Sequence, residues 1–176
     1  SGESALPHLM ASCGFNVMSI DEKGSYWDFN YFNRHYPVEK DDINNPRIQK
    51  KFDVITCISV LEHIPDSTNA VNNLFNLLKT NGYLILSFPY NSKKYIDNVY
   101  ELDNAGYGYD APYICQIFHD TNLDDWLLKN NGKIIDQEYY KVFTGDFWTF
   151  GERIYPPCKV SVDNNPHLTC VLIQKM

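Results

Sequence analysis

Short unbroken runs of apolar residues, rich in Val and Ile, alternate along this chain with longer stretches whose apolar residues are spaced as in helices. Such runs are typical of strands that are buried on both faces, because helices cover both sides of their sheet. The pattern therefore predicts an α/β fold. Strands are expected at residues 15–20, 51–59, 82–88, 133–142 and 168–174.

Helix boundaries are expected where capping residues and glycines flank the helical stretches. A first helix around residues 6–10 is closed by Gly14, and a second begins at Ser67 and ends at Gly82. Thr121 is expected to open a third helix, because it forms a capping-box pattern with an acidic residue three positions later.

Residues 90–118 lack a sustained helical or strand period and are rich in tyrosine. A stretch of this length without regular structure is uncommon inside a compact domain, so it is expected to be an inserted lid. Further along the chain, the adjacent prolines Pro156 and Pro157 predict a turn that leads to the last strand.

The composition indicates one domain without nucleic-acid or membrane partners. The chain has 176 residues, of which 44% are apolar, so residues 1–176 are expected to form a single domain. Its 15 Lys and Arg against 22 Asp and Glu give a net charge of −7, which would repel a phosphate backbone. The five cysteines contain no Cys-x-x-Cys pair and suit reduced thiols. With no apolar stretch of about 18 residues and no signal-peptide pattern, a soluble, cytoplasmic protein is expected.

Candidate binding residues follow the predicted strands, because ligands of open α/β sheets bind beyond the carboxyl ends of the strands. Asp21 ends the first strand, where a carboxylate can accept hydrogen bonds from both hydroxyls of a ribose; a solvated strand end is the alternative. Asp42 and Ile43 follow a short alternating stretch at 38–40 and could hold an adenine ring. The alternative is that Asp42 caps a short helix that starts at Arg47.

The segment FDVITCISVLEHIPD at 52–66, followed by LLKTNGYLILSFP at 77–89, resembles the fourth and fifth strands of the class I S-adenosylmethionine-dependent methyltransferases. SGES at 1–4 resembles the end of that family's glycine-rich first loop, and SID at 19–21 and KDDI at 40–43 extend the match. The resemblance implies a three-layer αβα, Rossmann-like sheet, mostly parallel with an antiparallel last strand.

The resemblance also implies S-adenosylmethionine as cofactor and assigns residues to it. Gly2 and its neighbours Glu3 and Ser4 would approach the methionine part, and Asp21 would hold the ribose. The remaining predicted contacts are Asp42 and Ile43 with the adenine, and the backbone at Ile58 and Ser59 after the fourth strand of the family.

The family's first strand, which precedes the glycine-rich loop, has no counterpart in the sequence. This strand lies at the centre of the family's sheet, and without it the neighbouring strands would expose unpaired backbone groups. We therefore expect the sequence to be truncated before Ser1.

His63 would face the region where the methyl group leaves. A histidine there can remove one proton from the acceptor near neutral pH, or it can be a hydrogen-bonded structural residue. A third reading is a divalent metal held by Glu62, His63 and His119 if the lid folds back. Ser59 stands where a further carboxylate would help, so no metal is predicted.

The predicted acceptor pocket consists of aromatic and polar residues that can stack on a ring or donate hydrogen bonds: Tyr90, Tyr107, Tyr109 and His119. Plain core packing is the alternative for the aromatic residues of 139–150. The function that the resemblance implies is methyl transfer from S-adenosylmethionine to a small molecule or glycan, by a single methyltransferase-like domain with a lid at about 90–118. The alternative is a non-catalytic methyltransferase-like module for binding or assembly.

Overall fold

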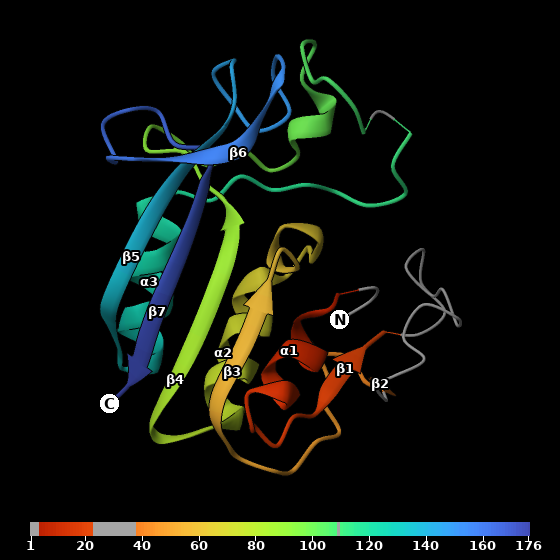
Figure 1. Ribbon diagram of the computed structural model, residues 1–176, viewed down its shortest axis with the longest axis vertical. Coiled ribbons are helices and arrows are strands. Elements are labelled where there is room, and N and C mark those ends of the chain that lie inside the picture. The colour runs from red at the N-terminus through yellow and green to blue at the C-terminus, as the bar shows by residue number, and fades with distance from the viewer. Residues whose placement is uncertain (1–3, 23–37, 109) are drawn as a thin grey trace. The chain divides into compact units, whose positions relative to one another are not determined.

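The computed structural model describes residues 4–22, 38–108 and 110–176 (Figure 1). The contacts divide the chain into two compact units, Ser1–Gln49 and Lys50–Met176. Three of the predicted site residues, Gly2, Glu3 and Tyr109, lie outside the described residues.

The first unit contains helix α1 (Leu6–Ser12) and a parallel pair of short strands, β1 (Ser19–Asp21) and β2 (Val38–Lys40). Gly14 follows α1 with a φ of 90°, which confirms it as the residue that closes the helix. The predicted strand at 15–20 is shorter than expected and begins only at Ser19. Its ladder is limited to three residue pairs, because β2, its partner, is itself three residues long.

The second unit is built on a five-stranded sheet with the order β3-β4-β7-β5-β6. Its strands are β3 (Phe52–Ile58), β4 (Leu78–Pro89), β5 (Gly132–Phe143), β6 (Arg153–Val160) and β7 (Leu168–Lys175). β3 and β4 are parallel, whereas β4–β7, β7–β5 and β5–β6 are antiparallel. The sheet is therefore mixed rather than mostly parallel, since β7 inserts between two strands of the same direction. The antiparallel last strand is confirmed.

Helices α2 (Ser67–Leu77) and α3 (Asp120–Asn130) contact each other and the strands β4 and β5 respectively. In Figure 1 both helices lie behind the sheet of the second unit. Trp126 of α3 is 1% exposed, and its ring meets Phe88 of β4 edge to face at 5.7 Å. Burial of such large aromatic side chains stabilises this core, together with the buried aliphatic residues of α2, β4 and β7.

The end of α2 differs from the prediction. The helix begins at Ser67 as expected, with Asp66 accepting a hydrogen bond from the Asn69 amide at 3.0 Å. It ends at Leu77, and Gly82 lies inside β4. Asn81 adopts a φ of 61°, and a Cβ on Gly82 would lie 2.9 Å from the carbonyl oxygen of Lys79. The glycine therefore marks a tight backbone approach within the strand and not the helix end.

The cap of α3 also differs from the prediction. His119, not Thr121, is the N-cap: its side chain accepts from the Thr121 amide, and the Asn122 side chain accepts from the His119 amide at 3.0 Å. The helix therefore begins before the acidic pattern that suggested Thr121. At the other end, Asn131 in the left-handed region precedes β5, which confirms the strand predicted at 133–142.

The predicted turn at Pro156 and Pro157 is wrong, because both prolines lie in β6. This strand pairs only with β5 and forms an edge of the sheet. An edge strand tolerates prolines, since their missing N–H groups need not join a second ladder.

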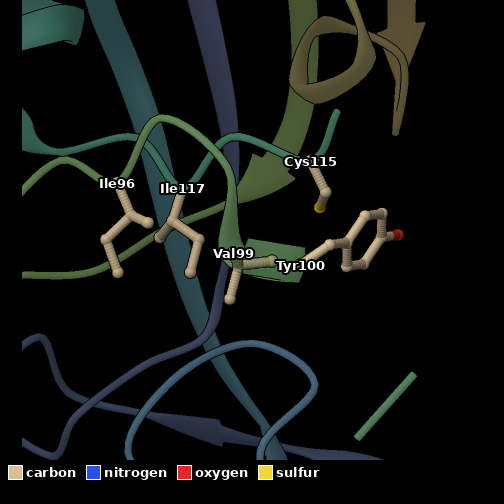
Figure 2. Packing of buried hydrophobic residues seen from close by; sticks show 5 residues of the cluster. All are labelled: Ile96, Val99, Tyr100, Cys115 and Ile117. Atoms are coloured by element: carbon tan, nitrogen blue, oxygen red, sulfur yellow. The ribbon is translucent and has the colours of Figure 1, made fainter. Parts of the chain in front are cut away.

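The segment 90–118 folds around an apolar cluster of its own, although its only regular element in the described part is a short turn of 3-10 helix, η2 (Val99–Glu101). Ile96 and Ile117 exchange backbone hydrogen bonds of 2.9 and 2.8 Å, which join the two arms of the segment. Figure 2 shows the buried members of this cluster: Ile96, Val99, Tyr100, Cys115 and Ile117.

Candidate functional site

The chain turns sharply at the carboxyl end of β3, where two of the predicted cofactor residues lie. Ser59 adopts a φ of 50°, and its amide donates to the Ser87 carbonyl of β4 at 2.9 Å. Ile58 is 40% exposed at the same turn. Ile58 and Ser59 are thus exposed residues at the position where a ligand of a parallel strand pair binds.

The 3-10 turn η1 (Leu61–His63) follows directly and carries the predicted catalytic histidine. The Nδ1 atom of His63 lies 2.8 Å from the carbonyl oxygen of Ile114. A carbonyl oxygen only accepts, so Nδ1 carries the hydrogen and Nε2 is the nitrogen with a lone pair. Burial lowers the pKa of His63, against a smaller opposing effect of the Ile114 carbonyl. His63 is therefore neutral near pH 7, which is the form that a base requires.

Glu62 is the neighbour of His63 and is 3% exposed. Its Oε1 lies 4.0 Å from Nε2 of His63, and its Oε2 has no hydrogen-bond partner among the residues that the structure describes. Burial raises the pKa of Glu62 to about 8, because a charged carboxylate is unfavourable away from solvent, and the hydrogen bond from its own backbone amide opposes this effect only in part. Glu62 is therefore largely protonated at neutral pH.

The end of the segment 90–118 contacts η1. Gln116 donates from its side-chain amide to the Ile64 carbonyl at 2.7 Å and from its backbone amide to the Glu62 carbonyl at 2.9 Å. The ring of Tyr113 meets the ring of His63 edge to face, with the centroids 4.7 Å apart. The sequence analysis did not identify Gln116, because it lies in a stretch without periodicity or motif.

The described acceptor candidates differ in exposure. Tyr90 is 1% exposed and donates from its hydroxyl to Asp120 at 2.7 Å, whereas Tyr107 is 45% exposed. His119 caps α3. Of these three residues, Tyr90 is buried, whereas Tyr107 is exposed and His119 is half-buried.

In the first unit, Asp21 is the last residue of β1, and Ser4 precedes α1 in an exposed position. The carboxylate of Asp42 accepts from the Asn44 amide at 2.8 Å. This bond forms a local turn, and the helix expected from Arg47 is absent, since residues 46–51 contain no helix. A depression in this unit is lined by Glu22, Lys40, Asp41, Asp42, Asn45 and Arg47.

Asp41 supports this turn, a role that the KDDI match at 40–43 did not indicate. It is 7% exposed and accepts from the backbone amide of Arg47 at 3.1 Å and from its Nε at 3.3 Å. Burial raises the pKa of Asp41, but the hydrogen bonds from Arg47 and Asp42 outweigh burial and hold the pKa below its usual value. A buried, charged Asp41 therefore fixes the loop that presents Asp42 and Ile43.

Within the described part of the chain, no three His, Cys, Asp or Glu side chains are arranged to hold a metal ion. The structure thus does not bring Glu62, His63 and His119 together as a ligand set. None of the described helices has the length and apolar character needed to cross a membrane.

The fold of the chain is that of S-adenosylmethionine-dependent methyltransferases. A solved methyltransferase of this kind from Archaeoglobus fulgidus matches 99% of the chain and 82% of its own length, with a TM-score of 0.64 and 14% identity. One from Methanosarcina mazei matches 99% of the chain and 89% of its own length, with a TM-score of 0.63 and 14% identity.

The family model described as "Methyltransferase domain" matches residues 2–137, and the chain belongs to this family. This confirms the resemblance, and S-adenosylmethionine is the cofactor of the family. Ubiquinone biosynthesis O-methyltransferase from Histophilus somni (strain 2336) is 32% identical over 111 residues, 56% of this chain and 44% of the relative. Its namesake from Coxiella burnetii (strain Dugway 5J108-111) is 26% identical over 148 residues, 77% of this chain and 62% of the relative. The chain thus spans about half the length of these curated relatives.

Proposed function

We propose that this chain transfers the methyl group of S-adenosylmethionine to a hydroxyl oxygen of a small molecule or glycan. The observation that carries the proposal is the hydrogen bond from Nδ1 of His63 to the Ile114 carbonyl, which leaves Nε2 as a basic nitrogen next to the end of β3. The curated relatives support oxygen as the acceptor atom, because they are O-methyltransferases.

The residues at the strand ends have the chemistry that the cofactor requires. The carboxylate of Asp21 would accept hydrogen bonds from the ribose hydroxyls, while Asp42 and Ile43 would take the adenine amino group and ring. The backbone of the exposed residues Ile58 and Ser59 would contact the adenosyl part, and Gly2, Glu3 and Ser4 the methionine part. When bound, the cofactor supplies an electrophilic methyl group on a sulfonium.

His63 supplies the base in this proposal. Its Nε2 takes the proton of the acceptor hydroxyl as the bond between the oxygen and the methyl carbon forms and the carbon–sulfur bond breaks. A neutral hydroxyl is a weak nucleophile, so removal of its proton lowers the barrier. Tyr107, the neighbouring lid residue Tyr109 and His119 would hold the acceptor, together with Tyr90 if its buried side chain moves outward.

A His63→Ala variant tests this assignment. We expect turnover to fall by about 100-fold to 10,000-fold, the usual contribution of a general base, with unchanged affinity for S-adenosylhomocysteine. Turnover is measured as transfer of labelled methyl to a panel of hydroxyl compounds, 3,4-dihydroxybenzoate and free sugars among them, and affinity by calorimetry. His8→Ala, which changes an exposed histidine of α1, is the matched control.

Unchanged turnover in His63→Ala would make His63 a structural residue. A parent chain that is folded but binds no S-adenosylhomocysteine and methylates nothing would instead favour the non-catalytic module.

A further inference from the structure

We infer that Gln116 is a positioning residue for His63, and that it fixes which ring nitrogen of His63 acts as the base. The inference rests on the proposed function, in which His63 removes the acceptor proton. It concerns a residue from the far end of the segment 90–118, more than 50 positions along the chain from the turn it contacts.

Gln116 donates three hydrogen bonds to backbone carbonyls around His63. The side chain of Gln116 is buried, at 2% exposure of the residue, and its Nε2 donates to the carbonyls of Ile64 at 2.7 Å and Leu61 at 3.4 Å. Its backbone amide donates to the Glu62 carbonyl at 2.9 Å. One residue therefore binds the carbonyl groups on both sides of His63.

A residue close to Gln116 in the sequence also holds the ring of His63. Ile114, two residues before Gln116, accepts from Nδ1 of His63 at 2.8 Å. The hydrogen bonds of Gln116 keep this carbonyl within reach of the ring, because they join residues 114–116 to η1 on either side of His63. If these bonds are lost, Nδ1 loses its fixed acceptor, and the hydrogen can move to Nε2, where it blocks the base.

Tyr95 sets the orientation of the Gln116 amide. Its hydroxyl donates to Oε1 of Gln116 at 2.7 Å, so the amide oxygen faces Tyr95 and the amide nitrogen faces η1. Tyr95 is 38% exposed, and its hydroxyl also lies 3.1 Å from Asp97. A change at Tyr95 therefore weakens the positioning of Gln116 without opening the core.

The test compares Gln116→Met, which keeps the length of the side chain and removes its donors, with Tyr95→Phe, which removes one hydroxyl. Tyr155→Phe is the matched control, because Tyr155 is 74% exposed on β6. The readout is the ¹⁵N spectrum of the histidine rings in the full chain at pH 7, where Glu62 is largely protonated, with the His63 signals assigned by their loss in His63→Gln.

We expect the parent and Tyr155→Phe to show His63 with hydrogen on Nδ1, and both test variants to shift toward hydrogen on Nε2. Turnover, measured with the compound of the panel that the parent methylates fastest, should fall about 10-fold to 100-fold in Gln116→Met, as for a misplaced catalytic group. It should fall about 2-fold to 10-fold in Tyr95→Phe, the value of one hydrogen bond. The affinity for S-adenosylhomocysteine should stay the same.

A Tyr95→Phe variant that keeps both the parental tautomer and the parental turnover overturns the inference, even if Gln116→Met fails to fold. A shifted tautomer with parental turnover overturns it as well, because the position of the hydrogen would then not matter for the reaction. Failure of the proposed function looks different: the parent itself would bind no S-adenosylhomocysteine and transfer no methyl group, while the ¹⁵N spectra would still report whether Gln116 holds His63.

Discussion

His167 is fully buried at the start of β7, and its ring is part of the structure rather than of the candidate site. Its Nδ1 accepts from the backbone amide of Phe143 at 3.0 Å. Burial lowers the pKa of His167 to about 4, with a smaller contribution from Lys141 in the same direction. Nothing in the sequence around His167 distinguishes it from an exposed histidine, because its partners come from β5.

This burial makes part of the folding stability dependent on pH. Between the folded pKa of about 4 and the unfolded value of 6.5, the unfolded chain binds more protons, so stability is full above pH 6.5 and is lost as the pH falls toward 4. The free energy of unfolding of the parent relative to His167→Gln should therefore shrink by on the order of 3 kcal/mol between pH 7 and pH 4.

Denaturant unfolding of both proteins at several pH values measures this difference, in which all other titrating groups cancel. A difference that does not change with pH would show that His167 titrates normally in the folded state.

Glu62 makes the folding stability depend on pH in the opposite direction. Its folded pKa of about 8 lies above the ordinary value of 4.5, so the folded chain binds more protons in this window and stability is lost as the pH rises from 4.5 to 8. Glu62→Gln, which stays neutral, should gain roughly 3 kcal/mol over the parent between pH 5 and pH 8.

The measurement is again the free energy of unfolding by denaturant, with Glu152→Gln, an exposed glutamate, as the matched control. Parallel pH curves for Glu62→Gln and the parent would mean that Glu62 is ionised in the folded chain and has a partner.

The two arms of the segment 90–118 are joined to each other by backbone hydrogen bonds. The backbone amide of Val99 donates to the carbonyl of Cys115 at 2.9 Å, and Ile96 and Ile117 exchange backbone hydrogen bonds nearby. Nearer the tip, Gly106 donates to the Thr149 carbonyl at 2.9 Å. We propose that the lid movement, which would exclude water from the reaction, is confined to the tip around residues 103–108.

Limited digestion with chymotrypsin tests this movement at Tyr107. Cleavage after Tyr107 should slow several-fold when S-adenosylhomocysteine and the hydroxyl compound that the parent methylates fastest are both present, whereas cleavage after Leu128, which is 85% exposed on α3, should not change. Equal rates at Tyr107 with and without the two ligands would argue against a closing lid.

The elements that the sequence predicts well are those whose signals are local. The strand at 51–59 and the start of α2 follow from an apolar run and from capping residues a few positions apart, and both are confirmed. The predictions that are wrong depend on contacts with residues far away in the sequence. Pro156 and Pro157 are tolerated in β6 because that strand has one neighbour, and the position of a strand in the sheet cannot be read from its own residues.

At the scale of the whole molecule, the family follows from the sequence, because its motif at 52–66 lies within one continuous strand and turn. The residues that hold the candidate site and the core in place cannot be predicted from the sequence. Gln116 reaches back to η1, and the partners of His167 lie on another strand, so these residues carry no local pattern. Asp41 and Asp42 are adjacent and of the same type, so the sequence does not distinguish them. The structure does, because Asp41 is buried and accepts a hydrogen bond from the Arg47 amide.

We propose that this chain uses S-adenosylmethionine, with Asp21 on the ribose and His63 at the acceptor. Calorimetric titration with S-adenosylhomocysteine tests it most directly on four proteins: the parent, Asp21→Ala, His63→Ala and Asp125→Ala, an exposed control on α3. We predict saturable one-site binding to the parent that is weakened about 30-fold to 1000-fold in Asp21→Ala, since a charge-assisted pair of hydrogen bonds is lost, and is unchanged in the other two variants. A folded parent that binds no S-adenosylhomocysteine, or an Asp21→Ala variant that binds it as tightly as the parent, would contradict the account.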